Sequence, residues 1–183
     1  PTSGTYTGTA YNPSVSVTLD GFGTLAEGTD YTLSWNKTGF TNADTYTVTV
    51  IGKGNYSGTK TATFTIDPAN IKLAIVILDQ NTFVYDGQPH KPTATVTFDS
   101  ATLTEGVDYD LYYMSEDQII KWDNGEPVKF IGNESSDSIN AGQYYVIARG
   151  KGNFAANRRV AYAAYTIKQA KNNWVKRPSI TGW

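Results

Sequence analysis

The chain of 183 residues has no cysteine, one histidine and one methionine. Without cysteine it can form no disulfide, no thiolate metal site and no thiol nucleophile. Its 15 basic and 17 acidic residues give a formal net charge of −2 and form no block of one sign. A nucleic-acid surface needs a basic stripe, so this charge pattern argues against nucleic acid as a partner and gives no reason to expect an anionic membrane.

Long apolar runs and long helix formers are also scarce. The longest apolar run, LAIVIL at 73–78, is too short to span a bilayer, and we interpret it as one strand buried on both faces. No signal peptide follows Pro1, and we expect no direct membrane insertion. Because the chain starts abruptly at PTSGTYTG, we expect it to be a piece of a longer protein. The abundant Thr, Tyr, Val and Gly favour strands over helices.

The chain contains two copies of one sequence pattern. Both copies show, in the same order, Tyr-x-Gly, Glu-Gly-x-Asp-Tyr, Asn-Ala, Gly-Lys-Gly-Asn and a closing aromatic-Thr-Ile. The matched segments are 6–8 with 85–87, 25–35 with 103–113, 42–56 with 140–154 and 64–66 with 165–167. Such an ordered series indicates a tandem duplication.

Apolar and polar residues alternate with period two inside each copy, which indicates strands with one solvated face. Tyr46, Val48 and Val50, for example, alternate with threonines. Short strands broken by Gly, Asn and Pro favour antiparallel sandwiches. We place the first repeat at 1–67 and the second at 68–168, and we expect 169–183 to be a linker or the start of a third repeat.

The second repeat is longer than the first by about twenty residues, between Tyr113 and Asn140. This insertion, about 114–139, contains Asp-Asn-Gly at 123–125 between the apolar segments IIKW and PVKF. Because Asp-Gly and Asn-Gly turns are typical of tight hairpins, we predict an inserted β-hairpin.

Taken together, the ordered motifs resemble the bacterial surface repeats called MBG or YDG domains, which are similar in role to bacterial Ig-like repeats. The resemblance covers nearly the whole chain. It implies an all-β fold of two tandem Ig-like antiparallel β-sandwich modules, the second enlarged by its hairpin. It also implies an extracellular, cell-wall-associated protein at a bacterial surface, and it supplies no catalytic residues to transfer.

The glycine–lysine loop GKGNYSG at 52–58 invites comparison with a phosphate-binding loop. A Walker-type loop needs Gly-Lys-Ser/Thr at the start of a helix, whereas here a strand follows. We therefore predict a turn in which Gly52 and Gly54 take positive φ and Asn55 bonds back to the chain.

Paired carboxylates occur at Glu27 and Asp30, and again at Glu105 and Asp108. Such pairs can perform acid–base catalysis or bind calcium. Since both repeats carry them in the same place, we favour a role in closing a turn, with calcium as the alternative. His90 has no partner pattern in the sequence that would predict a catalytic triad or a histidine metal site.

Two further side chains suggest a site. Trp122 lies in the insertion near Asp123 and Glu126, and an exposed Trp beside acids is typical of a sugar-binding platform. Cross-strand packing explains it equally well, and we favour packing. Lys72 is a candidate for a Lys–Asn isopeptide bond of the kind found in Gram-positive surface domains, although an edge or snorkelling lysine is the simpler interpretation.

These observations predict a non-enzymatic structural or adhesive module, a stalk or spacer, that needs no cofactor and no metal. The alternative is a binding module whose inserted hairpin recognises carbohydrate, mucin or a host matrix protein. Neighbouring repeats of the same chain are the other expected partners.

Overall fold

The computed structural model describes residues 2–123, 126–130, 138–156 and 160–171, with only the backbone described at 120–123 and 126–130. By spatial contacts the chain divides into two units. Unit 1 comprises Pro1–Ala74, Leu103–Asp110 and Arg149–Arg159, and unit 2 comprises Ile75–Thr102, Leu111–Ala148 and Val160–Trp183. The units group residues by contact and not by repeat, so the repeat boundaries above stay a prediction.

Strands and short 3-10 turns make up the regular structure. The strands are β1 (Ser3–Thr5), β2 (Thr18–Leu19), β3 (Gly23–Thr24), β4 (Tyr31–Trp35), β5 (Asp44–Gly52), β6 (Thr59–Asp67), β7 (Ile75–Leu78), β8 (Thr82–Val84), β9 (Ala94–Phe98), β10 (Ala101–Thr102), β11 (Tyr109–Ser115), β12 (Ile119–Asp123), β13 (Glu126–Phe130), β14 (Gly142–Gly150) and β15 (Val160–Lys168). The 3-10 turns are η1 (Ile71–Leu73), η2 (Glu116–Gln118) and η3 (Gly152–Phe154). Among the described residues, no helix is long and apolar enough to cross a membrane.

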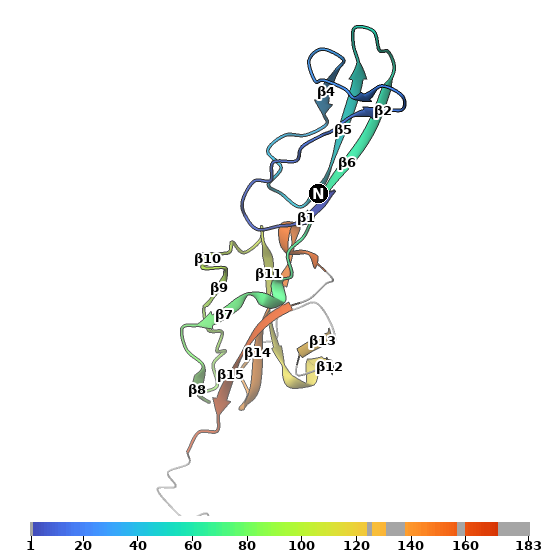
Figure 1. Cartoon of the computed structure of the whole chain (residues 1–183). Coiled ribbons are helices and arrows are strands. Elements are labelled where there is room, and N and C mark those ends of the chain that lie inside the picture. The colour runs from blue at the N-terminus through green and yellow to red at the C-terminus, as the bar shows by residue number, and fades with distance from the viewer. Residues whose placement is uncertain (1, 124–125, 131–137, 157–159, 172–183) are drawn as a thin grey trace, which may run out of the picture. The chain divides into compact units, whose positions relative to one another are not determined.

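Both repeats build a four-stranded sheet with the same order of strands. The first sheet has the order β1-β6-β5-β4, and the second has the equivalent order β8-β15-β14-β11 (Figure 1). The ladders β4–β5 and β5–β6 are antiparallel, whereas the first strand of each repeat pairs in parallel with the last, β1 with β6 and β8 with β15. The predicted all-β fold is confirmed, with two parallel pairings that alternation alone does not reveal.

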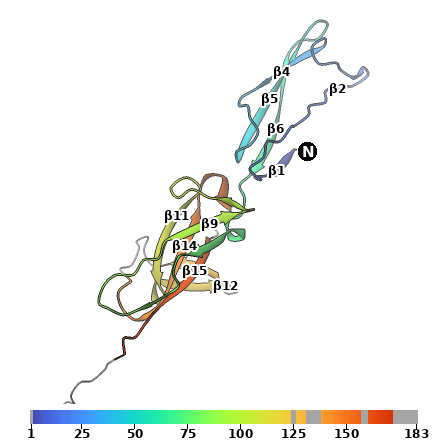
Figure 2. The same cartoon turned by 90° about the vertical axis from the view of Figure 1, so that its left-hand side faces the viewer.

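The alternating residues of these strands form the cores. In unit 1, Tyr46, Phe64 and Ile66 are buried and pack with partly buried aromatic side chains. These partly buried rings are Tyr6, Tyr11, Trp35 and Phe40. In unit 2 the equivalent positions Tyr144, Tyr165 and Ile167 are buried together with Val146. The strands β11, β14 and β15 of this unit lie side by side in Figure 2.

The insertion forms the predicted hairpin and also anchors it on the sheet. Strands β12 and β13 pair in antiparallel register, with Asp123 opposite Glu126. At the start of β12, Ile119 is buried in a second core with Met114, Ile147 and Val160. In the first repeat the equivalent face is rich in threonine, so β14 is buried on both faces where β5 is buried on one.

The prediction of a strand buried on both faces at 73–78 was wrong. Leu73 lies in the turn η1, and the strand β7 begins only at Ile75. β7 lies at one edge of the sheet β10-β9-β7, and its outward residues Ile75 and Ile77 are 63% and 55% exposed. The run is apolar throughout, but only Val76 and Leu78 face inward.

The residues that would align with β7 precede Pro1, outside the first repeat as the sequence gives it. Because Tyr6 aligns with Tyr85, Pro1 aligns with Gln80, two residues after β7 ends. Within the equivalent of β9, Thr18–Leu19 pairs with β3.

Candidate functional site

The two glycine-rich motifs of the first repeat bind each other. Lys53 Nζ donates to the carbonyl oxygen of Gly28 at 2.6 Å, and the Lys53 amide donates to the carbonyl oxygen of Asp30 at 2.8 Å. Asp30 Oδ2 in turn accepts from the backbone amide of Ala26 at 2.8 Å. The lysine of Gly-Lys-Gly-Asn therefore clamps the Glu-Gly-x-Asp loop.

The second repeat repeats this clamp. Lys151 Nζ donates to the carbonyl oxygen of Gly106 at 3.1 Å and to Asp110 Oδ1 at 2.9 Å. Its amide donates to the carbonyl oxygen of Asp108, whose Oδ2 accepts from the Thr104 amide at 2.8 Å. We did not predict this clamp from the sequence, although the two motifs occur together in both repeats and this pairing was a signal for it.

The loop at 52–58 is a turn, as predicted, but its two glycines differ in role. Gly54 has φ of +66° and its counterpart Gly152 has φ of +50°, which favours glycine. Gly52 does not take positive φ, so that part of the prediction was wrong. Instead, a Cβ on Gly52 would lie 2.9 Å from the backbone nitrogen of Ser57, too close for any side chain.

The aspartate of each carboxylate pair acts in its turn as expected, and the role of Glu27 and Glu105 stays a prediction. Asp30 and Asp108 hold the backbone amide four residues before them. Within the described part of the chain, no group of three or more His, Cys, Asp or Glu side chains could hold a metal ion.

His90 lies beside an aspartate and near a serine, yet these three side chains do not form a catalytic arrangement. His90 Nε2 is 3.0 Å from Asp86 Oδ1, and the ring stacks on Phe83. The amide of Gln88 first, and His90 in addition, hold the pKa of Asp86 below its ordinary value. Ser138 is fully buried, and its Oγ lies 2.6 Å from the hydroxyl of Tyr165, so it is not exposed as a nucleophile.

Lys72 does not lie in a dry strand. It is exposed in the turn η1, where its amide donates to the side chain of Asn70 at 3.1 Å. This placement removes the dry environment on which the isopeptide interpretation depended.

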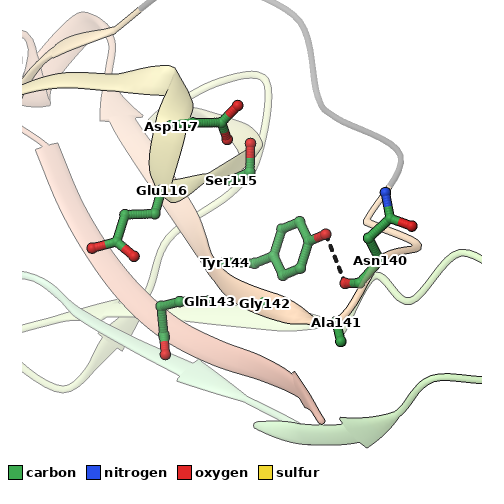
Figure 3. A pocket seen from close by; sticks show the side chains of 8 residues that line it. All are labelled: Ser115, Glu116, Asp117, Asn140, Ala141, Gly142, Gln143 and Tyr144. Carbon is green, nitrogen blue, oxygen red and sulfur yellow. Dashed lines mark hydrogen bonds between the residues drawn. The ribbon is translucent and has the colours of Figure 1, made fainter. Parts of the chain in front are cut away.

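An open pocket of about 640 Å³ lies where the insertion leaves the sheet (Figure 3). Ser115, Glu116 and Asp117 of the insertion face residues 140–144 across it. The hydroxyl of Tyr144 donates to the carbonyl oxygen of Asn140 at 2.9 Å. Burial, and then the nearby Asp117 carboxylate, raise the pKa of Tyr144.

The chemistry of this pocket is that of a polar surface site. The carboxylates of Glu116 and Asp117 are exposed, and the Tyr144 ring is buried, so the ring offers no face for stacking a sugar. The predicted ligand-binding side chains of Trp122, Asp123 and Glu126 lie outside the described side chains, although their backbone forms the hairpin β12–β13. A role for these three residues in binding stays a prediction.

No known protein-family profile matches the chain, and a comparison with proteins of described function finds no match. Among solved structures, one similar chain is "Crystal structure of Dscam1 isoform 6.9, N-terminal four Ig domains", with 12% sequence identity and a TM-score of 0.39. The similarity covers 92% of this chain and 43% of that one. The assignment to the all-β class rests on the strand pairing described above.

Proposed function

We propose that the chain is a non-enzymatic structural repeat module, which acts as a spacer within a larger protein at a bacterial surface. The observation that carries this proposal is the clamp found in both repeats. Lys53 and Lys151 bind backbone carbonyl oxygens, and Asp30 and Asp108 bind backbone amides. The charged side chains that could have served in catalysis or ligand binding are thus used to hold turns together.

A spacer gains from this use of its polar residues. A binding or catalytic site needs polar groups that converge on a ligand, whereas these groups converge on the protein's own backbone. The same arrangement occurs in both repeats, as a shared structural role requires. The threonine-rich outer face of β5 and β6 suits contact with solvent.

The surface location rests on the motifs quoted in the sequence analysis, which resemble bacterial MBG or YDG repeats. A chain without cysteine is compatible with export from a Gram-positive cell, since its stability needs no disulfide. The partners of such a module are the neighbouring repeats of its own polypeptide.

Labelling of intact cells tests this proposal. Antibodies raised against the 183-residue chain should label intact cells of the organism that encodes it, without permeabilisation. Exchange of the module in its parent protein for an unrelated β-sandwich pair of similar length should leave the parent's surface activity intact. Labelling only after lysis, or loss of activity on exchange, would contradict the spacer function.

A second candidate, recognition of glycans or mucin, is favoured by the open pocket at the base of the insertion. Its volume is in the range of ligand sites, and it carries two exposed carboxylates. Trp122→Ala and Asp117→Asn should each abolish glycan binding with no change in Tm if the insertion is a binding surface. Phe22→Ala, which removes a 72% exposed aromatic ring of the first repeat, is the matched control.

A further inference from the structure

In unit 1, the turn of the second repeat sits on residues of the first repeat through one asparagine. Asn153 Oδ1 accepts from the amide of Ala43 at 2.8 Å, and its Nδ2 donates to Asn42 Oδ1 at 3.1 Å. The carbonyl oxygen of Asn153 accepts from the amide of Ala69 at 2.8 Å. Both the side chain and the backbone of Asn153 are therefore used, and all of these residues belong to unit 1.

The next residue of the turn completes this contact. The ring of Phe154 packs edge-on against Tyr6 with 5.4 Å between centroids, and Phe154 is 3% exposed. Ala69 and Ile71 are also buried, at 2% and 0% exposure. The contact thus joins an asparagine and an aromatic ring to an Asn-Ala pair and a tyrosine.

The residues that contact Asn153 and Phe154, here called the receiving half, recur in the second repeat. Asn140, Ala141 and Tyr85 are the counterparts of Asn42, Ala43 and Tyr6. Their setting is the same in both repeats. The hydroxyl of Tyr46 donates to the carbonyl oxygen of Asn42, and the hydroxyl of Tyr144 donates to that of Asn140, each at 2.9 Å. The amides of Tyr6 and Tyr85 each donate to the end of the last strand, at 2.8 and 2.9 Å.

These receiving residues are exposed in unit 2. Tyr85 is 41% exposed. Asn140 and Ala141 are also exposed, and these two residues line the pocket shown in Figure 3. Ala170, the counterpart of the buried Ala69, is exposed as well.

The two turn residues Asn153 and Phe154, here called the inserting half, also recur in the first repeat. Asn55 and Tyr56 are the counterparts of Asn153 and Phe154, and Asn55 is exposed. The turn has the same form, since the Tyr56 amide donates to the Lys53 carbonyl oxygen as the Phe154 amide donates to that of Lys151. The lysine clamp holds both turns in place.

We infer that two copies of this chain dock head to tail, with the Asn55–Tyr56 turn of one copy on the Asn140–Ala141 end of the other. Asn55 Oδ1 accepts from the Ala141 amide, its Nδ2 donates to Asn140 Oδ1, and the Tyr56 ring packs against Tyr85. The inserting and receiving surfaces differ, so this association is heterologous and continues into open chains. The inference is independent of the proposed function, because it is argued from the contact within unit 1 alone.

The association between separate copies is weak. Within the chain the two halves are tethered by the short segment 68–70, and such a tether gives an effective concentration on the order of millimolar. Separate copies lack this tether. Association is therefore expected only as the protein concentration approaches about 1 mM.

Sedimentation equilibrium of the full chain, from about 10 μM to about 1 mM, tests the inference. The weight-average mass should rise with concentration, and Asn55→Ala and Asn140→Ala should each weaken association at least tenfold. Asn12→Ala, which removes an exposed asparagine outside both halves, is the matched control and should associate like the wild type. Unchanged Tm values should show that the variants are folded.

A mixture of the two variants gives the decisive result. The Asn140→Ala chain keeps its inserting turn and the Asn55→Ala chain keeps its receiving end, so the mixture should form a complex of one copy of each and grow no further. A constant mass up to about 1 mM, variants that associate like the wild type, or a mixture that behaves as the separate variants would overturn the inference.

Discussion

At the scale of single residues, space and not backbone angle requires the first glycine of each Gly-Lys-Gly-Asn turn. A Cβ on Gly150 would lie 2.0 Å from the carbonyl oxygen of Phe154 and 3.2 Å from Ile71 Cβ. Gly52 is limited in the same way by the backbone of Ser57. The chain returns past these glycines so closely that it has no room for a methyl group.

Gly150→Ala should therefore destabilise unit 1. The obstructing atoms belong to backbone that cannot rotate away, so we expect a loss of about 1–3 kcal/mol in the free energy of unfolding. Urea unfolding measures this loss. Gly142→Ala is the control, because its Cβ would meet only the Tyr144 ring at an ordinary 3.7 Å; equal stability of the two variants would contradict the explanation.

Burial of Tyr165 predicts a dependence on alkaline pH. Burial raises the pKa of Tyr165 to about 12 from an ordinary value of 10.0, despite the opposing effect of its bond to Ser138. Because the folded state holds its proton more tightly than the unfolded state, this contribution to stability is complete below pH 10 and is lost as the pH rises towards 12.

Tyr165→Phe removes this titration, and the first repeat already has Phe64 at the equivalent position. At neutral pH the variant should lose about 1 kcal/mol, since the Ser138 hydroxyl loses a partner. The Tm difference from the wild type should shrink as the pH is raised from 10 to 12. A constant difference over that range would show that the alkaline transition arises elsewhere.

At the scale of elements, the insertion is a covering layer for one face of a sheet. Ile147 and Val160 are buried under Ile119. Their counterparts in β5 and β6 are threonines, such as Thr49 at the position of Ile147. An apolar outer face and an extra hairpin therefore come together in the second repeat.

Ile147→Thr should unfold this second core. Ile147 is fully buried, and the change removes apolar volume and buries a hydroxyl, so we expect a loss of about 2 kcal/mol or more. Hydrogen exchange of the β14 amides should accelerate accordingly. Thr49→Ile, the reverse change on the uncovered face of β5, should alter stability little; a similar loss in both variants would mean that the insertion does not cover the sheet.

The sequence predicts much of this architecture because period-two alternation and turn residues act locally. The duplication, the strands of each repeat, the positive φ of Gly54 and the inserted hairpin follow from such local patterns. The exposure of Ile75 depends on which elements become neighbours. An apolar residue at a sheet edge and one in the core look the same in a sequence.

Among the described residues, no strand pairs with β2 in the way that β7 pairs with β9. A cavity of about 240 Å³ in the first repeat is lined by residues that include Val15, Val17, Val50 and Ala62. In the second repeat, Leu78 of β7 packs against the buried cluster around Tyr165.

Fusion of a copy of residues 72–79 in front of Pro1 should supply a strand that pairs with the counterpart of β9 and raise the Tm of the first repeat. The inward positions of the added strand, equivalent to Val76 and Leu78, carry the effect. Aspartate at those two positions should abolish the gain, whereas threonine at the positions equivalent to Ile75 and Ile77 should keep it. A gain that is insensitive to the inward positions would exclude strand addition.

At the scale of the whole molecule, the two repeats are variations of one design. The strand order is the same, and so are the lysine clamps and the tyrosine-to-asparagine bonds. What distinguishes the repeats within the aligned residues is the insertion between Tyr113 and Asn140 of the second. The lysine clamp could not be predicted from either motif alone, because its two partners are separated along the sequence by a pair of strands and meet only when these strands pair.

The parallel pairing of first and last strands determines how each repeat responds to tension. When the chain is stretched, the entry of β1 and the exit of β6 are pulled in opposite directions along one ladder, so its hydrogen bonds are sheared together and not unzipped one by one. The same geometry holds for β8 and β15. Force spectroscopy should therefore give two separate ruptures, and Gly4→Pro in β1 should weaken only one of them. A single gradual extension would show that the terminal strands carry no tension.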